Sequence, residues 1–158
     1  MSEAKPPSAS RTETAHLIMP SDANVYGTAF GGIVMQWIDL VAAMAAMRHA
    51  RLPVVTASVD QLNFTAPLRV GEMALLSARV NATFGSSMEV EVEVVSEHPV
   101  TGARQRGCDA FLTLVALGPD GRPSRVAPLL LESESERGRA AQALRRREAR
   151  LAQRARGE

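Results

Sequence analysis

One aspartate stands inside a long apolar segment and is the residue that most suggests chemistry. Asp39 lies between Phe30 and Met47, in a stretch whose other residues are mostly apolar. An ionised carboxylate in such surroundings pays a desolvation penalty unless it has partners or a chemical task. The functional interpretation is an active-site carboxylate. The structural alternative is an aspartate that pairs with an arginine or caps a neighbouring loop.

Two glycines mark the expected start of the helix that carries Asp39. Free backbone N–H groups near Gly31 and Gly32, together with the positive end of the helix dipole, favour developing negative charge and can form an oxyanion site. A missing Cβ also lets a substrate carbonyl come close. Simple turn geometry stays open as the alternative. Asp39 follows two turns later on the same face, roughly 11 Å along the axis, which leaves room for a thioester and a water.

Other kinds of site are less well supported. Cys108 adjoins an expected strand rather than a helix N-terminus, which disfavours a nucleophilic cysteine paired with a histidine. Three scattered histidines and one cysteine lack metal-ligand spacing, so no metal is predicted. No Walker motif and no strand-linked G-x-G-x-x-G occurs. The arginines from Arg145 onward alternate with Glu and Ala, which favours a solvated tail over binding of nucleic acid.

The elements that must position Asp39 follow from apolar periodicity. Apolar residues recur at three-and-four spacing after Gly32, and their neighbours are also apolar, which predicts a helix that is buried nearly all round and ends near His49. A short strand is expected from Arg11 to Met19. From Val54 onward the period becomes two, which predicts a meander of four long strands. Their expected ranges are 54–67, 72–84, 88–95 and 104–117.

The clearest of these strands alternates Met88, Val90, Val92 and Val94 with three glutamates, so one face is expected in the core and the other in solvent. This order of elements predicts an α+β fold with an antiparallel sheet. A sheet can bury a central apolar helix only by curling around it, and a second subunit is the natural cover for the remaining faces. The expected division is a flexible N-terminus over 1–10, one domain over 11–125, and a helical Arg/Ala-rich tail over 126–158.

Composition is consistent with one ordinary globular domain. The chain has 158 residues, 46% of them hydrophobic and 22% charged, and a formal net charge of +1. Gln36 and Asp39 interrupt the longest apolar stretch, which argues against a membrane span. A single cysteine and the absence of an apolar signal segment at the start predict a cytoplasmic protein.

The segment MPSDANVYGTAFGGIVMQWIDLVAAMAA resembles the signature of the hotdog acyl-CoA hydrolases, which is roughly P-x-D-x-N-x-x-G-x-x-F-G-G followed by a helix with an acidic residue. The segments VVTASVDQLNFTAPLRVGE and FGSSMEVEVEV are similar to the family's second strand and to its glycine-serine turn. The resemblance spans about residues 12 to 125. It implies a hotdog fold, in which a five-stranded antiparallel sheet wraps a long helix. It also implies dimers of the single-domain type, often assembled as trimers of dimers.

The resemblance implies hydrolysis of acyl-CoA thioesters to free acid and CoA. Asp39 is then the general base or nucleophile, and Asn24, from the other subunit, positions the water or the carbonyl. The acyl-CoA substrate supplies the only CoA, so no cofactor is expected.

By the same resemblance, Thr56 and Ser58 and the loop Gly85-Ser86-Ser87 line the CoA site, with a polar strand face and a plain hairpin turn as alternatives. Two rival functions stay open. One is a hotdog dehydratase or hydratase, which would pair a histidine with the acid. The other is a non-catalytic acyl-CoA-binding sensor.

Overall fold

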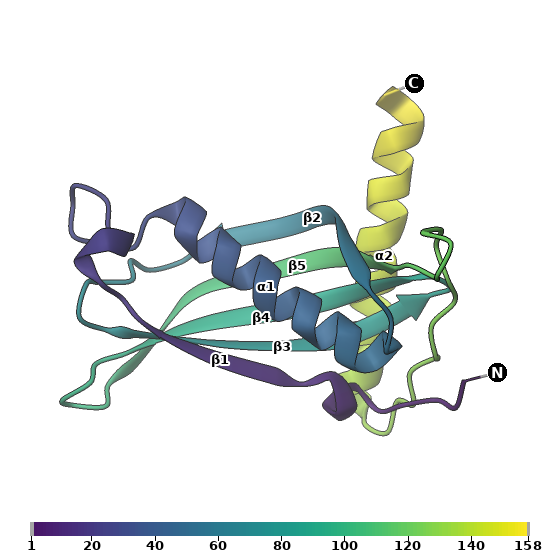
Figure 1. Ribbon diagram of the computed structural model, residues 1–158, viewed down its shortest axis with the longest axis horizontal. Coiled ribbons are helices and arrows are strands. Elements are labelled where there is room, and N and C mark those ends of the chain that lie inside the picture. Colours follow the sequence, from purple (N-terminus) through teal and green to yellow (C-terminus); the bar gives the residue numbers. More distant parts are fainter. Residues whose placement is uncertain (1, 158) are drawn as a thin grey trace.

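The computed structural model describes residues 2–157, in which a five-stranded antiparallel sheet curls around one long helix (Figure 1). Helix α1 spans Gly31–Ala50 and helix α2 spans Glu134–Gly157. The strands are β1 (Thr12–Leu17), β2 (Val54–Phe64), β3 (Met73–Phe84), β4 (Ser87–Glu97) and β5 (Arg104–Ala116), and two short 3-10 helices span Pro7–Ser10 and Pro20–Asp22. The predicted α+β fold, with its five antiparallel strands, long helix and C-terminal helix, is confirmed.

The order of strands in the sheet is β1-β3-β4-β5-β2. The predicted meander is correct for β3, β4 and β5, but it is wrong for β2, which pairs with β5 and forms one edge of the sheet. Alternation of apolar residues identifies a strand without identifying its partner. The end of β2 is tied to β5 by the N–H groups of Thr65 and Ala66, which both donate to the carbonyl of Gly107.

Helix α1 lies inside the curve of the sheet, and one of its faces forms the core with the inner faces of β3, β4 and β5. The opposite face is open in the single chain, where Leu40 and Met47 are 54% and 41% exposed. The expectation of a helix buried nearly all round is therefore wrong for one chain. An apolar face of this kind needs a cover from outside the chain.

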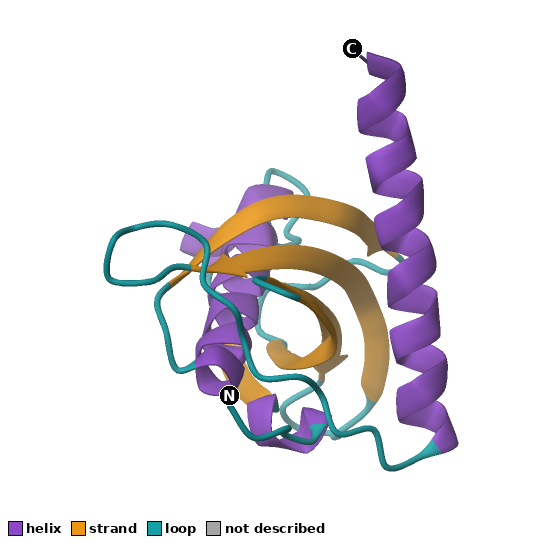
Figure 2. Cartoon of the chain, turned by 90° about the vertical axis from the view of Figure 1, so that its right-hand side faces the viewer, coloured by secondary structure: helices purple, strands orange, loops and turns teal. Residues whose placement is uncertain are grey.

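Helix α2 packs on the outer face of the sheet, so the sheet lies between the two helices (Figure 2). The last turns of α2 extend past the sheet. Glu89 on β4, expected in solvent, is 2% exposed because Arg146 of α2 covers it with a bidentate pair at 2.8 and 3.0 Å. Glu91 also pairs with Arg139. The C-terminal segment is therefore a docked helix rather than a solvated tail.

Part of the N-terminal segment, expected to be flexible, is also packed. Ser10 is fully buried, and its hydroxyl donates to the carbonyl of Pro7 and accepts from the N–H of Val80 at 2.9 Å. The N–H of Lys5 donates to the carbonyl of Pro128. A Pro- and Ser-rich composition concealed these contacts because they involve distant parts of the chain.

Candidate active site

A groove of about 340 Å³ lies between α1 and β2 and contains Asp39. Gly32 and Met35 line it from the helix, Thr56 and Val59 line it from the strand, and Leu112 of β5 lies beneath. The Thr56 hydroxyl donates to Oδ1 of Asp39 at 2.6 Å. The structure thus brings together three of the residues predicted for the site, Gly32, Asp39 and Thr56, in one mostly apolar groove.

Asp39 itself is exposed in the single chain. The argument that it is desolvated inside a buried helix is therefore wrong for one chain. The structural alternative is not found either, since none of the ion pairs among residues 2–157 involves Asp39 and its recorded side-chain partner is Thr56. A carboxylate with one hydrogen bond and free lone pairs can accept a proton from water or attack a carbonyl.

The two glycines open α1 at the end of this groove. Neither takes a positive φ, so the backbone does not require glycine there for a turn. A Cβ on Gly31 would make an ordinary contact with Phe64 at 3.8 Å, whereas a Cβ on Gly32 would come within 2.7 Å of the Phe30 ring. The small size of Gly32 therefore leaves room for the Phe30 ring beside the start of α1.

Asn24 lies in the loop before α1 and is occupied by contacts within that loop. Its Oδ1 accepts from the N–H groups of Tyr26 at 2.9 Å and Thr28 at 3.3 Å, and its Nδ2 donates to the Thr28 hydroxyl at 2.9 Å. No hydrogen bond within residues 2–157 joins it to Asp39, and it does not line the Asp39 groove. One chain alone does not bring the two predicted catalytic residues together.

Ser58 does not share the groove with Thr56, although both were expected along the CoA site. The Ser58 hydroxyl donates to Oδ1 of Asp60 at 2.7 Å, and Ser58 lies opposite Thr113, which sits between the core residues Leu112 and Leu114 of β5. Cross-strand neighbours share a face of a sheet, so Ser58 faces α2 rather than α1.

The hairpin Gly85-Ser86-Ser87 connects β3 to β4 at the far end of the sheet from the Asn24 loop (Figure 1). Gly85 has a φ of 73°, as a two-residue turn with glycine first requires. The Asn24 loop bonds to the segment just before β3, through Gly27 and Val70, so the length of β3 puts the two regions roughly 36 Å apart. Within one chain the hairpin and Asn24 cannot contact the same CoA head.

Other nucleophiles and bases are placed away from this groove. Cys108 is fully buried, and burial, with the nearby charge of Asp109, raises the pKa of its thiol to about 11, which disfavours a thiolate. His49 is fully buried at the end of α1, with Nε2 2.7 Å from the carbonyl of Ala127. His16 stacks on Trp37 with ring centroids 4.4 Å apart. Neither histidine lines the Asp39 groove.

Among residues 2–157, no group of three potential ligand side chains of the His, Cys, Asp or Glu type is placed to hold a metal ion. Over the same residues, neither long helix has the length and apolar character needed to cross a bilayer.

Comparison with known proteins agrees with the fold. The model of the thioesterase superfamily matches residues 26–103. The chain is 40% identical over 119 residues to the uncharacterized acyl-CoA thioester hydrolase YkhA of Bacillus subtilis (strain 168), a match that covers 75% of this chain and 69% of that protein. The chain belongs to the thioesterase superfamily, among the acyl-CoA thioester hydrolases with a hotdog fold.

A longer relative matches as well. The cytosolic acyl coenzyme A thioester hydrolase of Mus musculus is 39% identical over 132 residues, which cover 82% of this chain and 35% of the mouse protein. The chain therefore spans about a third of the length of that relative.

Two solved structures are similar over nearly the whole chain. A hexameric acyl-CoA thioesterase in its apo form has a TM-score of 0.93 and 38% identity, covering 98% of this chain and 99% of that one. An acyl-CoA hydrolase from Staphylococcus aureus, in complex with butyryl coenzyme A and coenzyme A, has a TM-score of 0.90 and 34% identity, covering 98% and 94%. That hydrolase has also been solved as variants with an aspartate, an asparagine or a threonine replaced by alanine.

Proposed function

We propose that the protein hydrolyses acyl-CoA thioesters to the free acid and CoA in the groove between α1 and β2. The observation that carries this proposal is the Asp39 carboxylate, which is exposed in an apolar groove and held by Thr56. In the S. aureus hydrolase, the aspartate that was replaced lies fifteen positions after the asparagine that was replaced, and the threonine lies seventeen positions after that aspartate. The same spacings separate Asn24, Asp39 and Thr56 in this chain.

In the proposed reaction, Asp39 accepts a proton from water, whose oxygen adds to the thioester carbonyl carbon. Backbone N–H groups near Gly31 and Gly32 stabilise the oxyanion. The C–S bond then breaks, and the CoA sulfur leaves with the proton that Asp39 received. Direct attack by the Asp39 carboxylate, followed by hydrolysis of the anhydride, is the alternative route to the same products. Neither route needs a cofactor.

The complete site is proposed to form between two subunits, with Asp39 from one and Asn24 from the other. Two observations support this arrangement: Asn24 and Asp39 do not meet within one chain, and the face of α1 that carries Leu40 and Met47 is open. Similar thioesterases of known structure are hexameric. A trimer of dimers would agree with the open face of α1 and with the hexameric state of the similar thioesterases. Each dimer would cover α1, and contacts between dimers would build the hexamer.

The hairpin Gly85-Ser86-Ser87 is proposed to bind CoA only from a subunit other than the one that supplies Asn24, because the length of β3 separates the two within a chain. Ser58 faces α2, so we propose no contact between it and CoA in the Asp39 groove. We also propose that the protein acts in the cytoplasm, as the name of the mouse relative indicates for that protein.

The test is thiol release from a panel of acyl-CoAs of increasing chain length, measured for wild type and for Asp39→Ala and Asn24→Ala. We expect wild type to release CoA and each variant to lose about 100-fold or more in kcat/KM while keeping its oligomeric state. Asp120→Ala, in the turn after β5, is the matched control and should keep the wild-type rate. Wild type that binds acyl-CoA without releasing thiol would indicate a sensor, and conversion without thiol release would indicate a dehydratase or hydratase.

Complementation tests the shared site separately. Asp39→Ala and Asn24→Ala chains are co-expressed with different tags. Each mixed dimer then has one intact site, and random pairing makes about half of the dimers mixed, so the whole population keeps roughly a quarter of the wild-type sites. Recovery of activity to about that level supports a site built by two subunits. No recovery in purified mixed dimers would mean that both residues act from the same chain.

A further inference from the structure

Strand β2 carries two bulges, and they decide which of its side chains face the groove. The register with β5 skips Ala57 and then Asp60, so each of these is an extra residue in β2. In a regular strand, Thr56, Ser58 and Asp60 would share one face. With the bulges, Thr56 and Val59 face the α1 groove, while Ser58 and Asp60 face α2.

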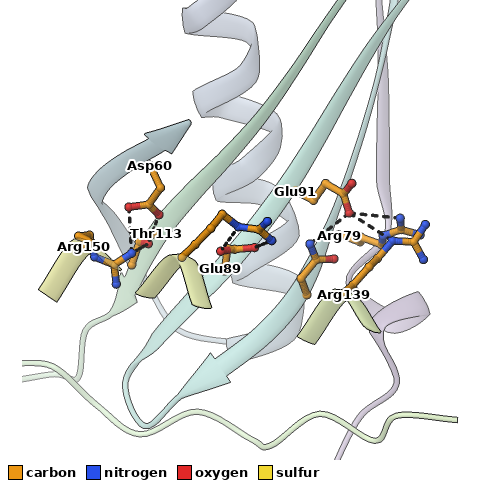
Figure 3. A network of polar contacts seen from close by, with 9 residues as sticks. Asp60, Arg79, Glu89, Glu91, Thr113, Arg139 and Arg150 are labelled. Carbon is orange, nitrogen blue, oxygen red and sulfur yellow. Dashed lines mark hydrogen bonds and ion pairs between the residues drawn. The ribbon is translucent and has the colours of Figure 1, made fainter. Parts of the chain in front are cut away.

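The carboxylate of Asp60, one of the bulged residues, accepts hydrogen bonds from three side chains. The hydroxyl of Ser58 donates to it at 2.7 Å. The other two donors, drawn in Figure 3, are the hydroxyl of Thr113 at 2.6 Å and Nη1 of Arg150 on α2 at 2.9 Å. The same Nη1 donates to the Thr113 hydroxyl at 3.0 Å. The side chains of Asp60 and Arg150 are 5% and 17% exposed, so water competes little for these bonds.

Burial alone would raise the pKa of Asp60, but the hydrogen bonds from Thr113, Ser58 and Arg150 and the charge of Arg150 outweigh it and lower the pKa below its usual value. Asp60 is therefore ionised at neutral pH, the form that accepts all three bonds.

This cluster lies on β2 at the second of its two bulges. Strand β2 is an edge strand, so a single ladder with β5 holds its register. A shift of one residue moves every side chain of a strand to the other face. Loss of the Asp60 contacts would allow the bulge to relax, and Thr56, four residues away, would then leave Asp39.

We propose that Asp60 and Arg150 are positioning residues, which fix the bulged form of β2 and thereby hold Thr56 against Asp39. The C-terminal helix is then a part of the active-site scaffold, although it lies on the opposite face of the sheet. This inference rests on the proposed hydrolysis in the Asp39 groove.

The test compares Arg150→Gln and Asp60→Asn with Arg146→Gln, in the full-length protein. Arg146 forms an equally buried ion pair between α2 and Glu89 of β4 and does not contact β2, so it is the matched control. At a temperature where all variants are folded, we expect about a tenfold fall in kcat for Arg150→Gln and Asp60→Asn, with KM changed less than about twofold. Arg146→Gln should keep kcat within about twofold and lower the melting temperature. Arg150→Lys should recover most of the rate, because an ammonium can donate to both Asp60 and Thr113.

A double-mutant cycle with Thr56→Val tests the route of the effect. If Arg150 acts through Thr56, Arg150→Gln should lower kcat by less than about twofold when Thr56 is already replaced. Equal losses of kcat in the two backgrounds, or equal losses for Arg150→Gln and Arg146→Gln, would overturn the inference. Wild type without thioesterase activity would instead refute the proposed function, so the two failures are distinct.

Discussion

Two aspartates on opposite sides of the sheet illustrate two uses of the same side chain. Asp60 lies on the α2 side, is 5% exposed and accepts hydrogen bonds from three side chains. Asp39 lies on the α1 side, is exposed and accepts one recorded hydrogen bond, from Thr56. The neighbours of Asp60 use its oxygen atoms fully, whereas the groove leaves those of Asp39 available for a water or a substrate.

The contrast extends to the two faces of the sheet. The α2 face is held by ion pairs from Arg139, Arg146 and Arg150 to acids on β4 and β2 (Figure 3). The α1 face toward β2 has an apolar groove with few polar atoms. A face held by ion pairs to α2 therefore supports a face on which reactive groups are left free.

The largest effect on the α2 face should come from breaking the ion pair of its most buried carboxylate, Glu89. Arg146→Ala leaves the Glu89 carboxylate, 2% exposed, without its charged partner, and we expect a loss of about 3 kcal/mol in unfolding free energy. That corresponds to a fall of roughly 6 to 12 °C in melting temperature. Calorimetry measures it, and the paired change Glu89→Leu with Arg146→Leu should restore most of the stability. If the single variant melts with wild type, the ion pair does not hold α2.

On the α1 face, the glycines should affect rate rather than stability. Gly32→Ala introduces a Cβ 2.7 Å from the ring of Phe30, which is 60% exposed and can turn away, so the protein should fold. We expect about a tenfold loss of kcat/KM, because the Cβ hinders the substrate carbonyl. Gly31→Ala, with its ordinary contact at 3.8 Å, should lose less. A larger loss for Gly31→Ala than for Gly32→Ala would mean that the substrate carbonyl approaches Gly31 rather than Gly32.

The pH dependence of stability should distinguish Asp60 as a structural carboxylate. Because its pKa is lowered on folding, its stabilisation is fully present above its unfolded pKa, near 3.8, and is lost as pH falls through the folded pKa. Denaturant titrations should show wild type more stable than Asp60→Asn at neutral pH, with a gap that narrows below about pH 4. A constant gap down to pH 2 would mean that ionisation of Asp60 does not contribute.

The smallest effect is expected at the end of α2 that extends past the sheet. Arg154 is exposed there and forms none of the ion pairs found among residues 2–157. Arg154→Gln should change the unfolding free energy by less than about 0.5 kcal/mol. An effect as large as that of Arg146→Ala would show that the extended turns of α2 have a partner in the assembly.

The sequence predicted the limits of the helices and strands better than it predicted which elements pair or pack together. The limits of α1 and of β3 to β5 follow from periodicity, because side chains alternate with the geometry of each element. The position of β2 beside β5 and the docking of α2 depend on contacts between residues far apart in the chain. The pattern of glutamates on β4 looked solvent-exposed, because nothing local shows that Arg146 covers Glu89.

Of the residues that the structure places in one groove, the sequence predicts Asp39 and Gly32 from residue type and spacing, and Thr56 through the family resemblance. It missed Asp60 and Arg150, since a bulge leaves no local pattern and β2 reads as a regular strand. The one signal was a cluster of polar residues, Ser58 and Asp60, at two-residue spacing with Thr56. That spacing suggested a shared polar face, and the two bulges separate it into two.

The most direct test of the account makes the same substitution at both aspartates. Asp39→Asn and Asp60→Asn each remove one charge and keep nearly the same shape. We expect Asp39→Asn to lose about 100-fold or more in kcat/KM for acyl-CoA with an unchanged melting temperature, and Asp60→Asn to lose about tenfold in kcat and to melt at a lower temperature. An Asp39→Asn protein that still releases thiol at the wild-type rate would contradict the account, because the groove carboxylate would then have no role in the chemistry.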